Sequence, residues 1–396
     1  MIYLDNAATT APNKEALRIA TQKYEELFYN PSASYKHGAE VHALIEDCKR
    51  TILETLVNEE DIPDYDIIFT GSGTEADNLA LKNANGFSII YSSRVEHSAI
   101  NESILHSEAG GINYIKTAKS GEIIANELYQ QISFTPVRNL CQSIVSISHI
   151  NSETGAVNDI YSLARNSKMY AHEKLCEVLF HSDGVQAYGK IPFKLTPDID
   201  MYSISAHKIG GIKGVGALVV RKDVIPRLHP VIYGGGQGNG LRSGTENVLG
   251  IIDFAEAVKR WAYIGEFFYS DSFYDRVEVV YSAVAGVKET LWLFLDKDKF
   301  VRISPEGGSP YILTVSARGK NNEVVQKILE EKYGILIGIG SACSSNHAMN
   351  KGRVLRALGY GEDIINGALR FSFSPQTTVE EIRTAAKAVN EVVWSL

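Results

Sequence analysis

The stretch from Asp66 to Lys82 reads DIIFTGSGTEADNLALK. Its first five residues, 66–70, have the apolar and β-branched character of a short buried strand. Gly71, Ser72 and Gly73 give a turn signal, and the following residues through Leu81 predict a helix. A buried strand that turns directly into a helix is a unit of α/β architecture.

The same alternation continues on both sides of this stretch. Because the predicted strands are apolar throughout and are separated by helices, we expect a mainly parallel sheet covered by helices on both faces. The predicted strands are 88–91, 143–147, 178–181, 201–204 and 215–220, and the predicted helices are 36–57, 97–106 and roughly 159–177.

The pattern weakens after about residue 255. A predicted helix near 246–263 leads into a segment whose clearest features are a strand at 311–315 and a closing helix at 378–394. This pattern favours a second, smaller α+β domain. We therefore expect a large domain at 14–255 and a small domain formed by 1–13 and 256–396.

Composition narrows the function classes. The chain has 396 residues, of which 44% are hydrophobic and 22% charged, as is ordinary for globular proteins. Its net charge of −8 argues against general binding of nucleic acid or of anionic membranes. No signal-peptide pattern and no apolar run of about 18 residues is present, so we expect a cytoplasmic protein without membrane or direct nucleic-acid partners.

The four cysteines are too few for a disulfide scaffold in a chain of this length. No two of them have the CxxC spacing, so we expect no structural zinc site. They are Cys48, Cys141, Cys176 and Cys343.

Polar residues follow the predicted strands, where α/β sheets bind ligands. Gly73 and Thr74 open a helix whose N–H groups suit a phosphate, although Thr74 could simply cap a tight turn. Asp183 ends a core strand and needs a partner such as a protonated pyridine nitrogen, or else caps the next helix. Lys208 could form a Schiff base if its amine is desolvated, although a lone lysine is more often a surface residue.

His97 could stack its flat ring on a cofactor, or could be an ordinary structural histidine. Taken together, a phosphate cradle, a carboxylate for a pyridinium and a lysine for an aldehyde are the parts that hold pyridoxal phosphate. The combination is more specific than any one of its members.

With these residues the chain resembles the NifS/IscS-type cysteine desulfurases, which are class V, fold-type I pyridoxal-phosphate enzymes. The resemblance runs from end to end. The matching stretches are YLDNAATT (3–10), NPSASYKHG (30–38), FTGSGTEADNLALK (69–82), EHSAI (96–100), HSDGVQAYGKIPF (181–193), SISAHKIGGIKGVGAL (203–218), GGGQGNGLRSGTEN (234–247), GSACSS (340–345), VLRALG (354–359) and LRFSFS (369–374).

The resemblance implies a cofactor site. Lys208 matches the lysine that forms the Schiff base with pyridoxal 5'-phosphate, and Asp183 matches the partner of its pyridine nitrogen. His97 matches the stacking histidine, which also carries protons. Gln186 matches the residue that bonds the ring hydroxyl oxygen, and the phosphate ligands would be Gly73, Thr74, Ser205 and His207.

The resemblance also implies a substrate site and a second copy of the chain. Arg370 matches the arginine that pairs with the substrate carboxylate, where a bidentate fork suits a planar anion, and Asn30 is expected to assist it. Thr245 matches a threonine that reaches the phosphate of the neighbouring subunit, which implies a homodimer.

Cys343 matches the catalytic cysteine. It lies in a stretch of small residues, GIGSACSSN (338–346), and ten residues separate it from VLRALG, as in the long-loop members of the family. The implied reaction takes sulfur from L-cysteine, leaving L-alanine and a persulfide on Cys343. The sulfur would pass to an acceptor protein, either a scaffold for iron–sulfur clusters or a tRNA-thiolation enzyme.

The sequence departs from the family at Ser152. The family usually has a second asparagine there, which contacts the cofactor ring oxygen. The C-terminal extension that docks the scaffold in longer members is also expected to be missing after Leu396. Two alternatives stay open: another class V enzyme, such as a selenocysteine lyase or an aminotransferase-like relative, or a non-catalytic protein that binds pyridoxal phosphate.

Overall fold

The computed structural model describes residues 1–396 except 83, 85–87, 135–141, 174–175, 262–271 and 341–351. Within the described residues, a seven-stranded sheet has the order β2-β8-β7-β6-β5-β3-β4. Only β8 runs antiparallel to its neighbours; the other pairings are parallel. The strands are β2 (Tyr65–Thr70), β3 (Ile89–Ser93), β4 (Gly111–Ile115), β5 (Gln142–Ser148), β6 (Glu177–Asp183), β7 (Met201–Ser205) and β8 (Gly216–Arg221).

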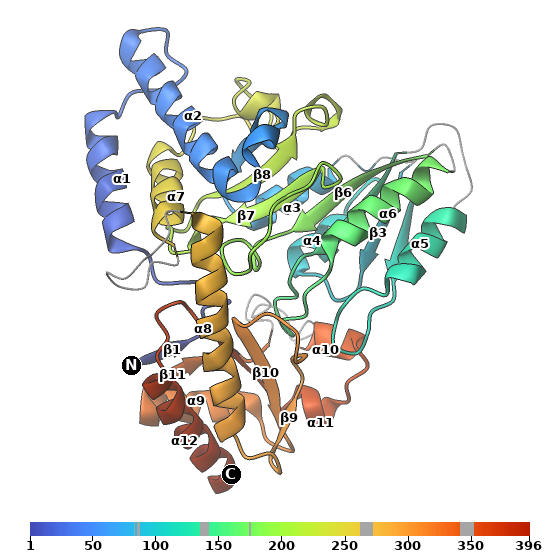
Figure 1. The fold of residues 1–396 in the computed structure, drawn as a ribbon, viewed down its shortest axis with the longest axis vertical. Helices are drawn as coiled ribbons and strands as arrows, with labels where there is room; N and C mark the ends of the chain where they lie inside the picture. The colour runs from blue at the N-terminus through green and yellow to red at the C-terminus, as the bar shows by residue number, and fades with distance from the viewer. Residues whose placement is uncertain (83, 85–87, 135–141, 174–175, 262–271, 341–351) are drawn as a thin grey trace.

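Helices cover both faces of this sheet, with α5 and α6 in front of it in Figure 1 and α3 and α4 behind it. The expected mainly parallel, helix-covered sheet is therefore confirmed. The helices of this part are α1 (Lys14–Glu26), α2 (Lys36–Leu56), α3 (Gly73–Leu81), α4 (Ser98–Leu105), α5 (Ala125–Phe134), α6 (Ile160–His172) and α7 (Val248–Arg260).

Burial on both faces explains why the strands are apolar throughout. Val145 and Phe180 are paired in register on β5 and β6 and belong to the large core cluster. Their neighbours Ile144 and Leu179 are also paired, point to the opposite face and belong to separate clusters. Alternate residues of one strand thus pack into different cores, and each strand needs apolar side chains at successive positions.

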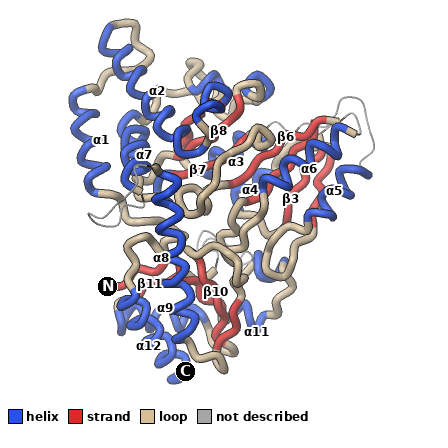
Figure 2. The backbone as a smooth tube through the Cα atoms, viewed as in Figure 1, coloured by secondary structure: helices blue, strands red, loops and turns tan. Residues whose placement is uncertain are grey.

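The C-terminal part contains a smaller antiparallel sheet, ordered β12-β10-β9, and lies below the large sheet in Figures 1 and 2. The N-terminal strand β1 (Ile2–Leu4) lies there too, because it pairs with β11 (Ile335–Ile337). The other elements are α8 (Phe273–Phe294), β9 (Phe300–Arg302), β10 (Ile312–Ala317), α9 (Asn322–Tyr333), α10 (Arg353–Ala357), α11 (Glu362–Ile365), β12 (Ala368–Ser372) and α12 (Val379–Ser395).

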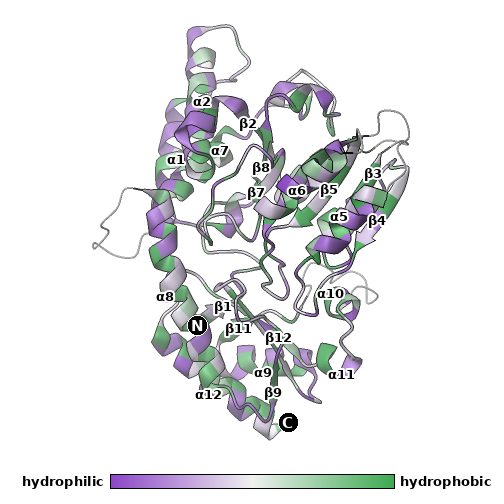
Figure 3. Cartoon of the chain, turned by 45° about the vertical axis from the view of Figure 1, so that its right-hand side comes forward, coloured by the Kyte–Doolittle hydropathy of each residue, from purple (hydrophilic) through white to green (hydrophobic). Residues whose placement is uncertain are grey.

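The prediction of a helix at roughly 159–177 is confirmed at its start, but its predicted C-terminal boundary is wrong. Helix α6 ends at His172, and β6 begins at Glu177. The division into domains at 14–255 and at 1–13 with 256–396 stays a prediction. In Figure 3 the outer helices carry hydrophilic and hydrophobic residues together, as amphipathic helices do. Within the described ranges, none of the helices combines the length with the apolar character that a membrane span needs.

Candidate active site

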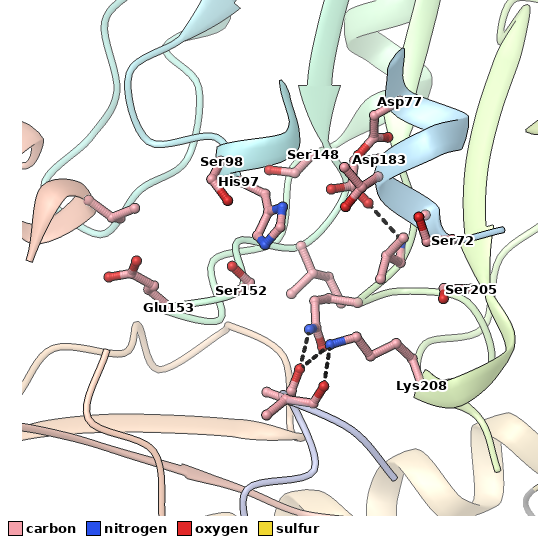
Figure 4. Close-up of a pocket in the computed structure, with 18 of the residues that line it drawn as sticks. Ser72, Asp77, His97, Ser98, Ser148, Ser152, Glu153, Asp183, Ser205 and Lys208 are labelled. Carbon is pink, nitrogen blue, oxygen red and sulfur yellow. Dashed lines mark hydrogen bonds between the residues drawn. The ribbon is translucent and has the colours of Figure 1, made fainter. Parts of the chain in front are cut away.

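A cavity of about 190 Å³ lies where β5, β6 and β7 end and α3 begins. The described residues from the large sheet form one wall, and Arg353, Val354 and Arg370 reach it from the C-terminal part. Figure 4 shows its labelled side chains converging from several elements. The sequence-predicted residues that line it are Gly73, Thr74, His97, Ser152, Asp183, Gln186, Ser205, His207, Lys208 and Arg370.

The start of α3 forms one end of the cavity. Ser72, and not Thr74, caps this helix, since the Ser72 hydroxyl accepts a 3.2 Å hydrogen bond from the Glu75 N–H. The alternative role of Thr74 as the cap is therefore wrong. A side chain at Gly73 would place its Cβ 2.6 Å from Val185 Cγ2, so a glycine suits this close approach. The first N–H groups of the helix are left for a ligand.

A buried hydroxyl faces the same end. Ser205 is only 3% exposed and lines the cavity, and its Oγ has no hydrogen-bond partner. A buried polar atom without a partner is costly unless a ligand satisfies it. Ser205 and the start of α3 together form a place for an anion with several acceptor oxygens.

Asp183 is a buried carboxyl group at the end of β6. Its Oδ1 accepts a 2.9 Å hydrogen bond from the Val185 N–H, which follows the expected strand-end placement. Burial raises the pKa of Asp183, and the hydrogen bond and the Lys208 amine oppose that rise. A protonated ring nitrogen in the cavity would favour the ionised form of this carboxyl group.

Asp77 lies beside Asp183 in Figure 4 and was not found from the sequence. It is 1% exposed, and burial and the charge of Asp183 raise its pKa well above the ordinary value. Its position is four residues after Gly73 on α3, so helical spacing puts both residues on one face of the helix but does not show that this face is buried.

Lys208 belongs to a single 3₁₀ turn, Ala206–Lys208, directly after β7. Its Nζ donates hydrogen bonds to the carbonyl oxygens of Ala7 and Ala8, at 2.6 and 2.9 Å. The Ser372 hydroxyl accepts from the Ala7 N–H at 2.8 Å, which ties this N-terminal segment to β12. The Lys208 amine is thus held at the cavity by the backbone of the N-terminal segment, about two hundred residues away in sequence.

His97 combines a structural contact with a place in the cavity. Its Nδ1 accepts a 3.2 Å hydrogen bond from the Ala99 N–H at the start of α4. Nδ1 therefore carries no proton, and Nε2 is the protonated nitrogen of the neutral ring. Burial, together with the charges of Lys208, Arg353 and Arg370, lowers the pKa of His97 to about 4.

Gln186 and His207 occupy the side of the cavity next to Lys208. The Gln186 amide donates to the Ala7 carbonyl at 2.8 Å. His207 Nδ1 lies 3.1 Å from the Thr9 hydroxyl, which is its contact with the N-terminal segment. Burial lowers the pKa of His207 to about 4, so the ring is neutral near pH 7.

Arg370 reaches the cavity from β12 and is 5% exposed. Its guanidinium donates to the Ser152 carbonyl oxygen and to Asp5 Oδ1, both at 3.0 Å. Its Nε is buried and has no hydrogen-bond partner. The contact to Ser152 uses the backbone, and the Ser152 side chain lies at the cavity near His97 (Figure 4).

Two predicted residues, Asn30 and Thr245, do not line this cavity. Both residues are exposed. Their sequence neighbours line a second cavity, namely Pro31 and Ser32 beside Asn30, and Gly244 and Glu246 beside Thr245. Their roles stay predictions. Cys343 lies outside the described residues.

Two further residues at the cavity were missed. Glu153 is 5% exposed, and its Oε2 has no hydrogen-bond partner; burial raises its pKa. It follows Ser152 directly, so the same strand-end reasoning could have included it. Arg353 donates to the carbonyl oxygens of Arg94 and Glu96, at 2.6 Å for the first, and no sequence signal pointed to it.

The donor set fits pyridoxal phosphate. The unpartnered Ser205 hydroxyl and the start of α3 suit its phosphate, Asp183 suits its ring nitrogen, and the Lys208 amine suits its aldehyde. All of them line one cavity, as the cofactor requires.

Comparison with known proteins gives an independent result. A family model described as aminotransferase class-V matches residues 2–384. The chain is 31% identical to the cysteine desulfurase IscS of Buchnera aphidicola subsp. Schizaphis graminum, an alignment that covers 100% of this chain and 93% of the relative. It is 30% identical to the cysteine desulfurase IscS of Dictyoglomus turgidum, covering 100% and 95%.

Solved structures show the same similarity. The NifS-like protein of Rickettsia africae has a TM-score of 0.84 and 29% identity, with both chains covered in full. A structure described as SspA in complex with cysteine has a TM-score of 0.72 and 26% identity, covering 96% of this chain and 100% of the other.

Proposed function

The chain belongs to the class-V aminotransferase family, and from that membership we propose that it is a pyridoxal-phosphate-dependent cysteine desulfurase. It would convert L-cysteine to L-alanine and retain the sulfur as a persulfide on Cys343. The observation that carries this proposal is the meeting of Lys208, Asp183 and Arg370 at one cavity. These three side chains supply an amine, a buried carboxyl group and a carboxylate-binding fork.

The cofactor, when bound, supplies a ring that accepts the electron pair released at the substrate α-carbon. Asp183 would hold the ring nitrogen in its protonated form, because a nearby carboxylate favours that charge. The Lys208 amine would take the α-proton of the substrate, and His97, which lines the same cavity, would carry protons through Nε2. Arg370 would bind the substrate carboxylate by two parallel N–H groups.

Sulfur transfer is assigned to Cys343 by the resemblance in sequence. Its thiolate would attack the substrate sulfur, so that an S–S bond forms while the C–S bond breaks. The electron pair of the C–S bond stays with carbon, which gains protons and leaves as alanine. A thiolate is needed because the protonated thiol is a poor nucleophile.

The two cysteines that the structure describes, Cys48 and Cys176, suit this role less well. Cys48 is buried on α2, and burial raises its pKa to about 12. Cys176 lies between α6 and β6 and is partly buried. Cys176→Ala therefore offers a matched control for Cys343→Ala.

The test measures sulfide and alanine from L-cysteine in the presence of a reductant. Wild type is expected to form both, and Cys176→Ala is expected to match it. Cys343→Ala should keep the visible absorption of the bound cofactor but release no sulfide. Sulfide formation by Cys343→Ala at the wild-type rate would overturn the mechanism.

A parallel assay with L-selenocysteine addresses the closest alternative activity. A selenocysteine lyase would use that substrate without depending on Cys343. A protein that binds the cofactor but turns over neither substrate would instead be the non-catalytic relative. The joint presence of Lys208, Asp183, His97 and Arg370 in the sequence favours an active enzyme.

We also propose a cytoplasmic homodimer in which Thr245 reaches the site of the neighbouring subunit. The supporting observation is that Thr245 is exposed and away from the cavity of its own chain. Mixing Lys208→Ala with Thr245→Ala protein should then restore activity in the mixed dimers. The acceptor of the sulfur would be an iron–sulfur scaffold or a tRNA-thiolation enzyme, and persulfide transfer from purified enzyme to each class would discriminate between them.

A further inference from the structure

Lys190 is a buried lysine that the mechanism above does not use. It follows β6 in the segment after Gln186 and is only 2% exposed. Lysines are almost never this buried without a specific partner, because the ammonium group loses its hydration. Its Nζ donates a 2.8 Å hydrogen bond to Gln186 Oε1.

Two contacts together determine which way the Gln186 amide points. The Ala7 carbonyl can only accept, so it faces the amide nitrogen, and the amide oxygen is left to accept from Lys190 Nζ. The amide therefore directs its oxygen to Lys190 and its nitrogen to Ala7, at 2.8 Å in each case. The nitrogen carries a second hydrogen, and Gln186 lines the cavity.

The Ala7 carbonyl joins this arrangement to the reactive amine. It accepts from Gln186 Nε2 at 2.8 Å and from Lys208 Nζ at 2.6 Å. A chain of hydrogen bonds thus runs from Lys190 through Gln186 and Ala7 to Lys208. Among the described residues, Gln186 accepts the hydrogen bond of Lys190 and also lines the cavity, so this side chain links Lys190 to the cavity.

We propose that Lys190 is a positioning residue that fixes the Gln186 amide so that its free N–H faces the ring oxygen of the cofactor. This inference rests on the proposed binding of pyridoxal phosphate. Burial, together with the charges of Lys208 and Arg370, lowers the pKa of Lys190 well below its ordinary value. The hydrogen bond to Gln186 needs an N–H of Lys190 and does not depend on a positive charge at Nζ.

The test substitutes Lys190→Met, which keeps the apolar stem and removes the donor. The Gln186 N–H favours the deprotonated form of the ring oxygen, so its misplacement should raise the pH midpoint of the visible absorption band by about half a unit or more. Pyridoxal phosphate should also bind about fivefold more weakly to the cofactor-free protein. Both readouts are made without turnover.

Lys288→Met is the matched control. Lys288 on α8 is also 2% exposed and donates one hydrogen bond, to the Ser309 carbonyl at 2.9 Å, but it does not line the cavity. Lys288→Met should lower thermal stability, as the replacement of a buried lysine generally does. The pH midpoint of the visible band should stay at the wild-type value.

A double-mutant cycle with Gln186→Met decides whether Lys190 acts through Gln186. In the Gln186→Met background, Lys190→Met should add no further shift in the midpoint. If Lys190→Met does not fold, Lys190→Gln, whose shorter side chain does not reach Gln186 as Lys190 does, takes its place in the cycle with the same expected coupling.

Three results would overturn the proposal: a Lys190 variant with the wild-type midpoint, an equal shift in Lys288→Met, or a full shift that persists without Gln186. A wild-type protein that shows no visible band with added pyridoxal phosphate would contradict the proposed function instead. The two failures are therefore distinguishable.

Discussion

The two walls of the cavity are built in different ways. The wall from the large sheet consists of strand ends and a helix start, with Asp183, Lys208 and Gly73 placed by backbone that is continuous with buried strands. The opposite wall is assembled from distant segments, since Arg370 on β12 contacts Asp5 and Ser152, which are far from it in sequence. The side chains of the first wall directly follow strands or begin a helix, although the Lys208 amine also contacts Ala7 and Ala8, whereas the second wall is assembled by tertiary contacts.

This difference favours different functions for the two walls, cofactor binding for the first and substrate binding for the second. Strand ends anchored in a packed core hold their side chains rigidly, which suits the binding of a cofactor that stays in place. Arg370 is held by hydrogen bonds to Asp5 and to the Ser152 backbone, which a substrate carboxylate can replace, and this suits a substrate that enters and leaves. Substitutions in the first wall should thus affect chemistry and cofactor binding, and those in the second should affect substrate binding.

The largest effect is expected for Asp183→Asn. An amide has almost the same shape but cannot carry the charge that keeps a ring nitrogen protonated, so kcat should fall by at least about a hundredfold. Steady-state alanine formation measures this loss, with the cofactor content checked by absorption. A kcat within a few-fold of wild type would mean that Asp183 does not face the ring nitrogen.

The next largest effect concerns stability of the large sheet in acid. His181 is fully buried, with its two ring nitrogens each 2.9 Å from a serine hydroxyl, of Ser146 and Ser203, and burial lowers its pKa to about 3. The unfolded chain protonates this ring near pH 6.5 and the folded chain does not. The contribution of the neutral His181 ring to the unfolding free energy is therefore fully present above about pH 6.5, and it is lost as the pH falls towards 3.

His181→Asn tests this linkage. Between pH 7 and 4.5, His181 should account for about 2–3 kcal/mol of the loss in unfolding free energy, and the variant should lack that part of the loss. Urea denaturation at the two pH values gives the difference. Equal losses in variant and wild type would show that the ring is protonated in the folded state.

A smaller effect on substrate binding is expected for Arg370→Lys in the second wall. An ammonium group keeps the positive charge but loses the planar fork, so the KM for L-cysteine should rise about tenfold while kcat changes less. Initial rates over a range of cysteine concentrations separate the two constants. A fall in kcat with an unchanged KM would instead place Arg370 in the chemical step and remove the contrast between the walls.

The first wall was largely predictable from the sequence, because strand ends in an α/β sheet meet at one edge. Gly73, Asp183 and Lys208 were found by that reasoning, and the structure brings them to one cavity. Asp77 was missed although it lies one helical turn from Gly73. Its burial depends on how α3 packs on β6 and β7, which spacing alone does not show.

The second wall could not be predicted by local pattern. Arg370 was expected only through the family resemblance, and nothing in the sequence near it indicates that β12 approaches Asp5. The pairing of β1 with β11 joins segments more than three hundred residues apart, and such short strands give weak signals. Tertiary packing sets these contacts, so they appear only in the structure.

The smallest effects test whether the walls are independent. Ser72 caps α3 in the first wall, and Thr378 caps α12 in the C-terminal part through a reciprocal pair of hydrogen bonds with Glu381. Replacing either cap by alanine should cost about 1 kcal/mol of stability, measured by urea denaturation. Only Ser72→Ala should also weaken binding of pyridoxal phosphate, by a few-fold, because Ser72 lines the cavity and its cap sets the N–H groups of α3. If Thr378→Ala weakens the binding of pyridoxal phosphate as much as Ser72→Ala does, the C-terminal part must be coupled to the phosphate end of the cavity. The first wall could then not be treated as independent of the second.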